Sequence, residues 1–199
     1  MITLGNHTWR RQEIGPYLAA SERVIRPANF AASAPGRGST IVAAADGTRV
    51  AVVNVLGSLS LQPACNMWEL VDGLVDEARA STPVVVVDVH AEATSEKVAL
   101  ARWLDGRATA VIGTHTHVQT ADARVQPGGT AAITDAGMTG PHDSVIGVKA
   151  EQATYRMRTG MPVRFEVAEG GVRIEGVLVE CDAASGRATA ITPIRVPWP

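Results

Sequence analysis

The sequence predicts an α/β fold, in which helices pack on layered β-sheet. Short apolar runs rich in Val, such as residues 83–89, alternate along the chain with segments whose apolar residues recur at helical spacing, such as residues 67–80. The 199 residues are 46% hydrophobic and 19% charged. This composition suits a single domain with a buried core and excludes a disordered chain.

Composition also excludes several classes of function. The formal net charge of −2 provides no basic field for stable nucleic-acid binding or for binding to anionic membranes. No apolar stretch is long enough to span a bilayer, and no secretory signal is visible. Cys65 and Cys181 stand alone without CxxC spacing, which is typical of a reducing compartment. We therefore expect a cytoplasmic protein.

The N-terminal segment predicts a strand followed by a polar loop. Residues 1–4 are expected to end a strand that leads directly into Gly5-Asn6-His7-Thr8. A helix over residues 9–20 should follow, with a break or kink at Gly15-Pro16, because proline removes a helical hydrogen bond.

The middle of the chain predicts alternating strands and helices. Asp46-Gly47 is a strong hairpin signal between strands over residues 40–44 and 49–55. The pattern then predicts, in chain order, a helix over 67–80, a strand over 83–89 ending at His90, a helix over 95–103, a strand over 109–112 ending at Gly113, a strand over 130–134 and a helix over 149–158.

The last forty residues change character. Three strands are expected over residues 163–168, 172–180 and 188–196, separated by turns at Glu169-Gly170-Gly171 and Ser185-Gly186. We expect them to form an antiparallel set, packed on the same domain as an extra sheet or edge.

Four of the five histidines follow predicted strands in polar loops: His7, His90, His115 and His117. Ligands collect beyond the carboxyl ends of strands in open α/β sheets, and neutral imidazole binds Zn, Fe and Mn. In extended chain, residues i and i+2 project to the same side, so His115 and His117 are expected to face one point. A single histidine after a strand is more often only hydrogen-bonded in its loop, but four together favour a shared metal site. An amidohydrolase barrel is disfavoured, because its His-x-His pair comes early in the chain.

Longer motifs carry a more specific signal. They occur in order along almost the whole chain: Gly5-Asn6-His7-Thr8-Trp9, Arg26-Pro27-Ala28-Asn29-Phe30, His90-Ala91-Glu92-Ala93-Thr94-Ser95-Glu96-Lys97, the segment 113–122, Asp135-Ala136-Gly137-Met138-Thr139-Gly140-Pro141, Ser144-Val145-Ile146-Gly147 and Met161-Pro162-Val163-Arg164-Phe165-Glu166. In these motifs the chain resembles the YmdB-type bacterial metallophosphoesterases.

The resemblance implies a fold and an activity. The implied fold is a metallophosphoesterase-like sheet sandwich flanked by helices, in α/β/β/α layers. The implied activity is hydrolysis of cyclic nucleotides or related phosphodiesters by a hydroxide held between two divalent metal ions. Fe or Mn is expected, with Zn as a third candidate, because nitrogen and oxygen ligands accept all three. The implied partner is a small phosphodiester substrate, and the family implies a homo-oligomer.

The resemblance also implies roles for single residues. Asn6, His90 and His115 match the ligands of one metal, and His117 matches a ligand of the other. His7 matches the catalytic histidine and would protonate the leaving ribose oxygen. To these we add His142, which lies in a Gly- and Pro-rich loop and is a candidate substrate-binding residue.

The resemblance is incomplete at the N-terminus. Family members carry two further β-α units before the Gly-Asn-His segment, and the metal-binding Asp and the bridging Glu of those units have no counterpart here. We therefore expect one domain over residues 1–199 that binds two metals only in the complete enzyme and one in this chain. Either Met1 lies at an internal position, or the chain is a fragment, and the intact motifs favour both over a shortened, non-catalytic relative that acts by binding or assembly.

Overall fold

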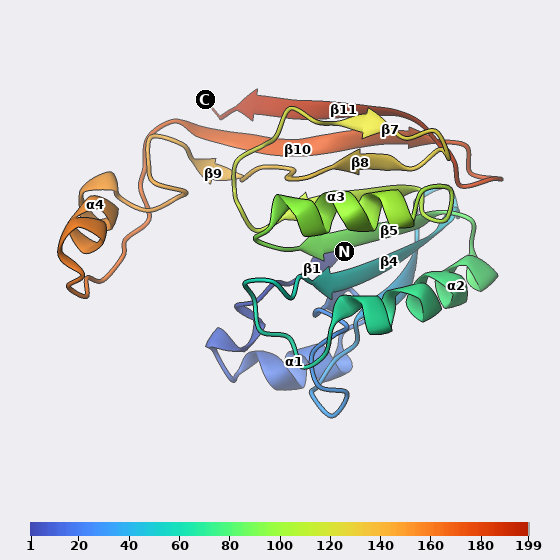
Figure 1. Cartoon of the computed structure of the whole chain (residues 1–199), viewed down its shortest axis with the longest axis horizontal. Coiled ribbons are helices and arrows are strands. Elements are labelled where there is room, and N and C mark those ends of the chain that lie inside the picture. Colours follow the sequence, from blue (N-terminus) through green and yellow to red (C-terminus); the bar gives the residue numbers. More distant parts are fainter. Residues whose placement is uncertain (199) are drawn as a thin grey trace.

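The computed structural model describes residues 1–198 and confirms the predicted α/β sandwich (Figure 1). A six-stranded sheet and a three-stranded sheet pack face to face, and helices cover the other face of the larger sheet. No helix among residues 1–198 combines the length and the apolar character needed to cross a membrane.

The carboxyl ends of the central strands lie at one edge of the larger sheet. Its strands are β3 (Ser39–Ala43), β4 (Arg49–Leu56), β5 (Val85–His90), β6 (Ala110–Thr114), β7 (Arg124–Val125) and β8 (Ala131–Ile133), in the spatial order β3-β4-β5-β6-β8-β7. The four inner strands are parallel, and β3 and β7 pair antiparallel at the edges. The predicted hairpin joins β3 to β4, with Gly47 at φ +86°. His90 pairs in register with Thr114, so the chain leaves β5 and β6 at neighbouring points.

Successive side chains of the inner strands point to opposite faces of the sheet, and this produces two hydrophobic cores. Val85, Val87 and Val89 of β5 are fully buried against helices α2 (Val71–Ser81) and α3 (Thr94–Trp103). Val86, between them, faces the second sheet. Burial of each such Val contributes about 1.5–3 kcal/mol relative to exposure. The predicted helix over residues 67–80 is confirmed, with a separate 3₁₀ turn, η2 (Met67–Glu69), before α2.

The second sheet confirms part of the predicted C-terminal set. Its strands are β9 (Gly140–Pro141), β10 (Val172–Cys181) and β11 (Ala188–Pro197), in the spatial order β11-β10-β9. β10 and β11 form a long antiparallel pair, as expected from the turns that bound them. In Figure 1 they run along one side of the molecule.

The strand predicted over residues 163–168 is wrong. Only Val167 makes an isolated bridge, with Val148. The segment comes after helix α4 (Ala150–Thr159) in the chain and is bonded to that helix instead of to a strand. The backbone N–H of Glu166 donates to the side chain of Gln152 at 2.7 Å. Alternating apolar residues indicate two faces, but a strand also requires a partner strand. In Figure 1, α4 and this segment lie apart from the two sheets.

The helix predicted over residues 9–20 is interrupted, but at a different place. A 3₁₀ turn, η1 (Thr8–Arg10), is followed by helix α1 (Ile14–Ala20). Pro16 lies in the first turn of α1, where a backbone N–H has no helical partner, so proline is tolerated there. The chain before η1 forms β1 (Ile2–Thr3), which pairs in parallel with β2 (Val24–Ile25).

Candidate functional site

Three separate segments bring polar atoms together at the carboxyl edge of the larger sheet. His90 ends β5, His115 follows β6, and Asn6 lies in the loop after β1. His90 Nε2 lies 3.0 Å from Asn6 Oδ1 and 3.1 Å from His115 Nδ1. A Cβ atom at Gly5 would lie 2.3 Å from the ring of His90, so glycine is required for the loop to approach this closely. The structure therefore places three of the residues singled out from the sequence at one point.

Hydrogen bonds fix the tautomer of His90. The hydroxyl of Thr114 donates to Asp88 Oδ1 at 2.8 Å, and it lies 3.0 Å from His90 Nδ1. Because that hydroxyl has already used its hydrogen, it accepts from Nδ1–H of His90. The lone pair of neutral His90 is thereby placed on Nε2, the atom that faces Asn6 and His115.

The same reasoning applies to His115. Its Nε2 lies 3.0 Å from the carboxylate of Glu92, which makes Nε2–H the donor and leaves the lone pair on Nδ1. Asn6 Oδ1, His90 Nε2 and His115 Nδ1 are then three acceptors that face one another with no hydrogen between them. Such a set is unfavourable unless a cation lies among the acceptors, and metal-binding histidines commonly donate their other N–H to a carboxylate or similar acceptor. The residues present therefore fit a divalent metal ion.

The candidate metal site described above consists of three ligand atoms, which are the three acceptors of Asn6, His90 and His115. In residues 1–198, no group of three or more His, Cys, Asp and Glu side chains is placed to hold a metal ion. The third donor at this point is the amide oxygen of Asn6, which is neutral. A single locus with two imidazoles and one amide therefore carries no ligand charge of its own, and a bound cation there would keep its full positive charge.

Burial governs the titration of the two histidines. It lowers the pKa of His90 from 6.5 to about 4, and the charges of His115 and Lys97 add to this effect. Burial also lowers the pKa of His115, although the carboxylate of Glu92 acts in the opposite direction. For Asp88, burial raises the pKa, and the hydrogen bond donated by Thr114 opposes that rise. Both imidazoles are thus neutral at pH 7, the state that binds a metal.

The low pKa of His90 predicts a pH dependence of stability in metal-free protein. The unfolded chain takes up this proton near pH 6.5 and the folded chain only near pH 4. Between those values the unfolded state binds more protons, so the free energy of unfolding should fall as pH is lowered from 6.5 to about 4. Urea unfolding in EDTA, compared between the natural chain and His90→Gln, isolates this contribution. Identical pH profiles for the two proteins would contradict the shift.

The backbone around His115 and His117 differs from the extended chain assumed in the sequence argument. That premise is wrong, because His115 has φ +97° and His117 has φ +65°, conformations that non-glycine residues rarely adopt. His117 is exposed and its Nδ1 lies 3.2 Å from the carbonyl oxygen of Ile146, which leaves Nε2 free to bind a ligand. After burial, the charge of His117 is one of the smaller causes that lower the pKa of His90 and of His115.

A buried ion pair holds this unusual turn. Lys97 Nζ lies 3.4 Å from Asp135 Oδ2, and the two side chains are 2% and 1% exposed. Asp135 also accepts hydrogen bonds from the backbone N–H and the hydroxyl of Thr116, at 2.9 and 2.6 Å. Thr116 lies between the two left-handed histidines, so Asp135 fixes the residue that joins them. Sequence reasoning missed this role. The available signal was a lysine on the same face of α3 as buried Leu100 and Ala101.

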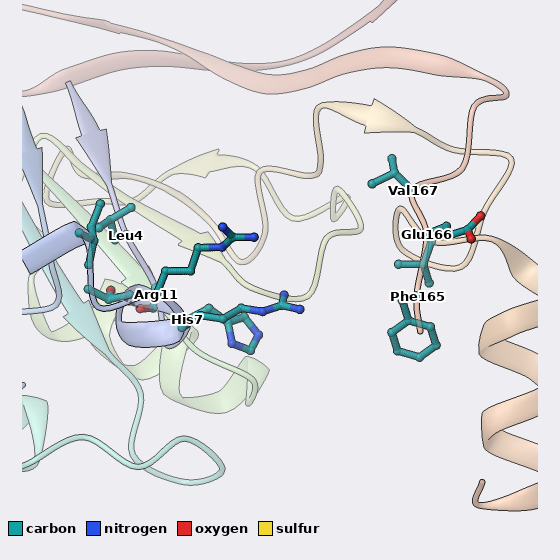
Figure 2. Close-up of a pocket in the computed structure, with 11 residues that line it drawn as sticks. Leu4, His7, Arg11, Phe165, Glu166 and Val167 are labelled. Carbon is teal, nitrogen blue, oxygen red and sulfur yellow. Dashed lines mark hydrogen bonds between the residues drawn. The ribbon is translucent and has the colours of Figure 1, made fainter. Parts of the chain in front are cut away.

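His7 lines a separate cavity. Its side chain is exposed and lines a space of about 700 Å³. Figure 2 shows His7 and Arg11 on one wall, and Phe165, Glu166 and Val167 on the other, with the carboxylate of Glu166 directed away from the space between them. Gly5, which lies against the ring of His90, also lines this cavity, so the cavity adjoins the cluster of acceptors.

His142 lies in a second, smaller cavity of about 290 Å³ that is also lined by His117. Its Nδ1 lies 2.9 Å from the carbonyl oxygen of Gly140, and its buried Nε2 lies 3.4 Å from the carboxylate of Glu175. Both ring nitrogens therefore face protein atoms.

Comparison with known proteins identifies relatives over nearly the whole chain. A family model described as YmdB-like protein matches residues 1–194. A Bacillus subtilis (strain 168) protein named 2′,3′-cyclic-nucleotide 2′-phosphodiesterase is 47% identical over 195 residues, covering 98% of this chain and 74% of that protein. A Mycoplasma pneumoniae protein named putative phosphatase/phosphodiesterase is 35% identical over 202 residues, covering 98% of this chain and 71% of the relative.

Solved structures show the same architecture. A hypothetical protein from Thermus thermophilus superposes with a TM-score of 0.91 at 41% identity, covering 100% of this chain and 77% of that one. A structure titled as a novel phosphatase of Mycoplasma pneumoniae superposes with a TM-score of 0.87 at 34% identity, covering 98% and 71%. The sandwich, and with it the edge at which the candidate site lies, is therefore common to these proteins.

Proposed function

Because the chain belongs to the YmdB-like family, whose named relatives are phosphodiesterases, we propose that it hydrolyses cyclic nucleotides in a metal-dependent reaction. Phosphodiesterase activity as such rests on the relatives. The cyclic-nucleotide substrate, the metal dependence and the roles of single residues are proposals, which the geometry of the site supports.

The observation that carries the proposal is a set of three acceptor atoms. His90 Nε2 lies within 3.1 Å of both Asn6 Oδ1 and His115 Nδ1. These three would hold one divalent ion, Fe or Mn by preference and Zn as the third candidate. His117 Nε2 would contribute to a second ion in the complete two-metal site. When bound, the metals supply charge neutralisation at the phosphoryl oxygens and activation of water.

The chain's own residues supply proton transfer and orientation. Water adds to phosphorus and releases one proton to the solvent as the P–O bond to one ribose oxygen breaks, which opens the cyclic ester and yields a nucleoside monophosphate. His7 would donate a proton to the departing ribose oxygen. Glu92 and Thr114 bond the other ring nitrogens of His115 and His90, and would so keep the lone pairs available to a bound ion. His142 forms part of the wall of the neighbouring cavity.

Replacement of His7 tests the assignment of the proton donor. We expect His7→Ala to lower kcat for 2′,3′-cyclic AMP by about 10²- to 10⁴-fold, the usual contribution of general acid catalysis. Metal content per chain should stay the same, because His7 is not among the three acceptors. Hydrolysis assays with Mn²⁺ or Fe²⁺, together with metal analysis, measure both quantities.

The control for His7→Ala is Gln12→Ala, which removes an exposed side chain from the same segment. Its kcat should equal that of the natural chain. Full activity in His7→Ala would remove His7 from the mechanism. Absence of diesterase activity in the metal-loaded natural chain, on cyclic nucleotides and on bis-p-nitrophenyl phosphate, would overturn the proposed function itself.

A further inference from the structure

The cavity beside His7 is larger than the reaction at one phosphate requires. It measures about 700 Å³, within the range of sites that enclose a whole small ligand. One wall comes from the loop after β1 and from α1, and includes His7, Arg10 and Arg11. The opposite wall comes from the segment after α4 and includes Phe165 and Glu166, as Figure 2 shows.

The charges on the two walls are not balanced. Arg10 and Arg11 are exposed, and within residues 1–198 neither forms an ion pair with a carboxylate. Glu166, the acidic residue of the opposite wall, is already paired with Lys149 at 2.5 Å. The cavity therefore presents two unpaired guanidinium groups, which bind phosphate through paired N–H donors.

The opposite wall presents an aromatic ring. Phe165 is 42% exposed and lines the cavity. The guanidinium of Arg156 lies 5.3 Å from the centre of the ring and holds it through a cation–π contact. A ring held in this way and open to the cavity is a surface on which a nucleobase stacks.

We infer that this cavity is a subsite for a nucleotide that carries a second phosphate, in addition to the one that reacts. Phe165 stacks on the base, and Arg10 and Arg11 bind the second phosphate. The preferred substrate class is then a 2′,3′-cyclic nucleotide with a 5′-phosphate, and not the unsubstituted cyclic nucleoside phosphate. This inference rests on the proposed function, since His7 joins the cavity to the reacting phosphate.

Two matched ligands test the subsite: adenosine 2′,3′-cyclic phosphate with and without a 5′-phosphate. In the natural, metal-loaded chain we expect the 5′-phosphate to raise kcat/KM by about tenfold or more, mainly through KM, because a charge-assisted hydrogen bond contributes that much affinity. The double variant Arg10→Ala/Arg11→Ala should reduce this ratio to near one. Arg23→Ala, which removes an exposed arginine outside the cavity, should retain it.

The role of Phe165 is tested separately with Phe165→Ala. We expect kcat/KM to fall for both nucleotides relative to ribose 2′,3′-cyclic phosphate, which has no aromatic group to stack. Equal loss on all three substrates would overturn the stacking role.

Binding measurements separate failure of the subsite from failure of the proposed reaction. Calorimetry with His7→Ala should show tighter binding of the 5′-phosphorylated ligand even without turnover. Equal affinity for the two ligands, or a preference that survives in Arg10→Ala/Arg11→Ala, overturns the subsite. Lack of turnover with the binding preference intact overturns the proposed reaction and supports the subsite.

Discussion

His90→Ala is expected to abolish metal binding at the candidate site and to reduce phosphodiesterase activity with it. His90 Nε2 lies within hydrogen-bond distance of both Asn6 Oδ1 and His115 Nδ1. Its loss removes the central one of the three metal ligands and leaves only two. Loss of a residue that only orients a ligand costs about 10- to 100-fold in metal affinity, so loss of a ligand itself should exceed about 100-fold. Calorimetric titration with Mn²⁺ and metal analysis of the purified chain measure the effect.

Thr114→Val provides the graded comparison. It leaves His90 in place but removes the hydroxyl that holds its Nδ1–H. We expect metal affinity to fall by about 10- to 100-fold, which is less than in His90→Ala. Unchanged metal affinity in His90→Ala, with the fold intact by circular dichroism, would show that the cluster does not bind the metal.

Lys97→Met is expected to produce the largest loss of stability. It leaves Asp135, 1% exposed, as a buried carboxylate without its cation. Removal of one partner from a buried ion pair costs about 3–5 kcal/mol of unfolding free energy. Hydrogen bonds from Thr116 to Asp135 offset part of this cost, so the lower end of the range is expected. Urea unfolding measures the change.

Two further variants make this prediction specific. Lys97→Met/Asp135→Asn removes the unpaired charge as well, and should recover part of the stability lost in the single variant. Arg102→Met replaces an exposed cation on the same helix, and should change stability by less than about 0.5 kcal/mol. Equal effects of Lys97→Met and Arg102→Met would contradict a structural role for the buried pair.

Elements that depend on a single local sequence signal were predicted correctly. The hairpin at Asp46-Gly47, the strand that ends at His90 and the helix over residues 95–103 were all predicted within one or two residues of their observed bounds. Each depends on side chains that are close in sequence. The segment 163–168 has an equally good alternating pattern but no partner strand along its length, and the sequence does not reveal partners.

The candidate site divides in the same way. Its histidines and Asn6 could be selected from motifs and from their positions after strands. The left-handed turn at His115 and His117, the link from Asp88 through Thr114 to His90, and the support from Lys97 and Asp135 could not.

The sequence by itself determined the fold class, the strand ends and the residue types that gather there, because periodicity and turn chemistry act over a few residues. Only the tertiary structure decided which ring atoms face one another. Asn6 and His90 are 84 positions apart, and the lone pair of each imidazole is set by a hydrogen bond to another element. Contacts at such separations arise when whole sheets and helices pack, so no local pattern encodes them.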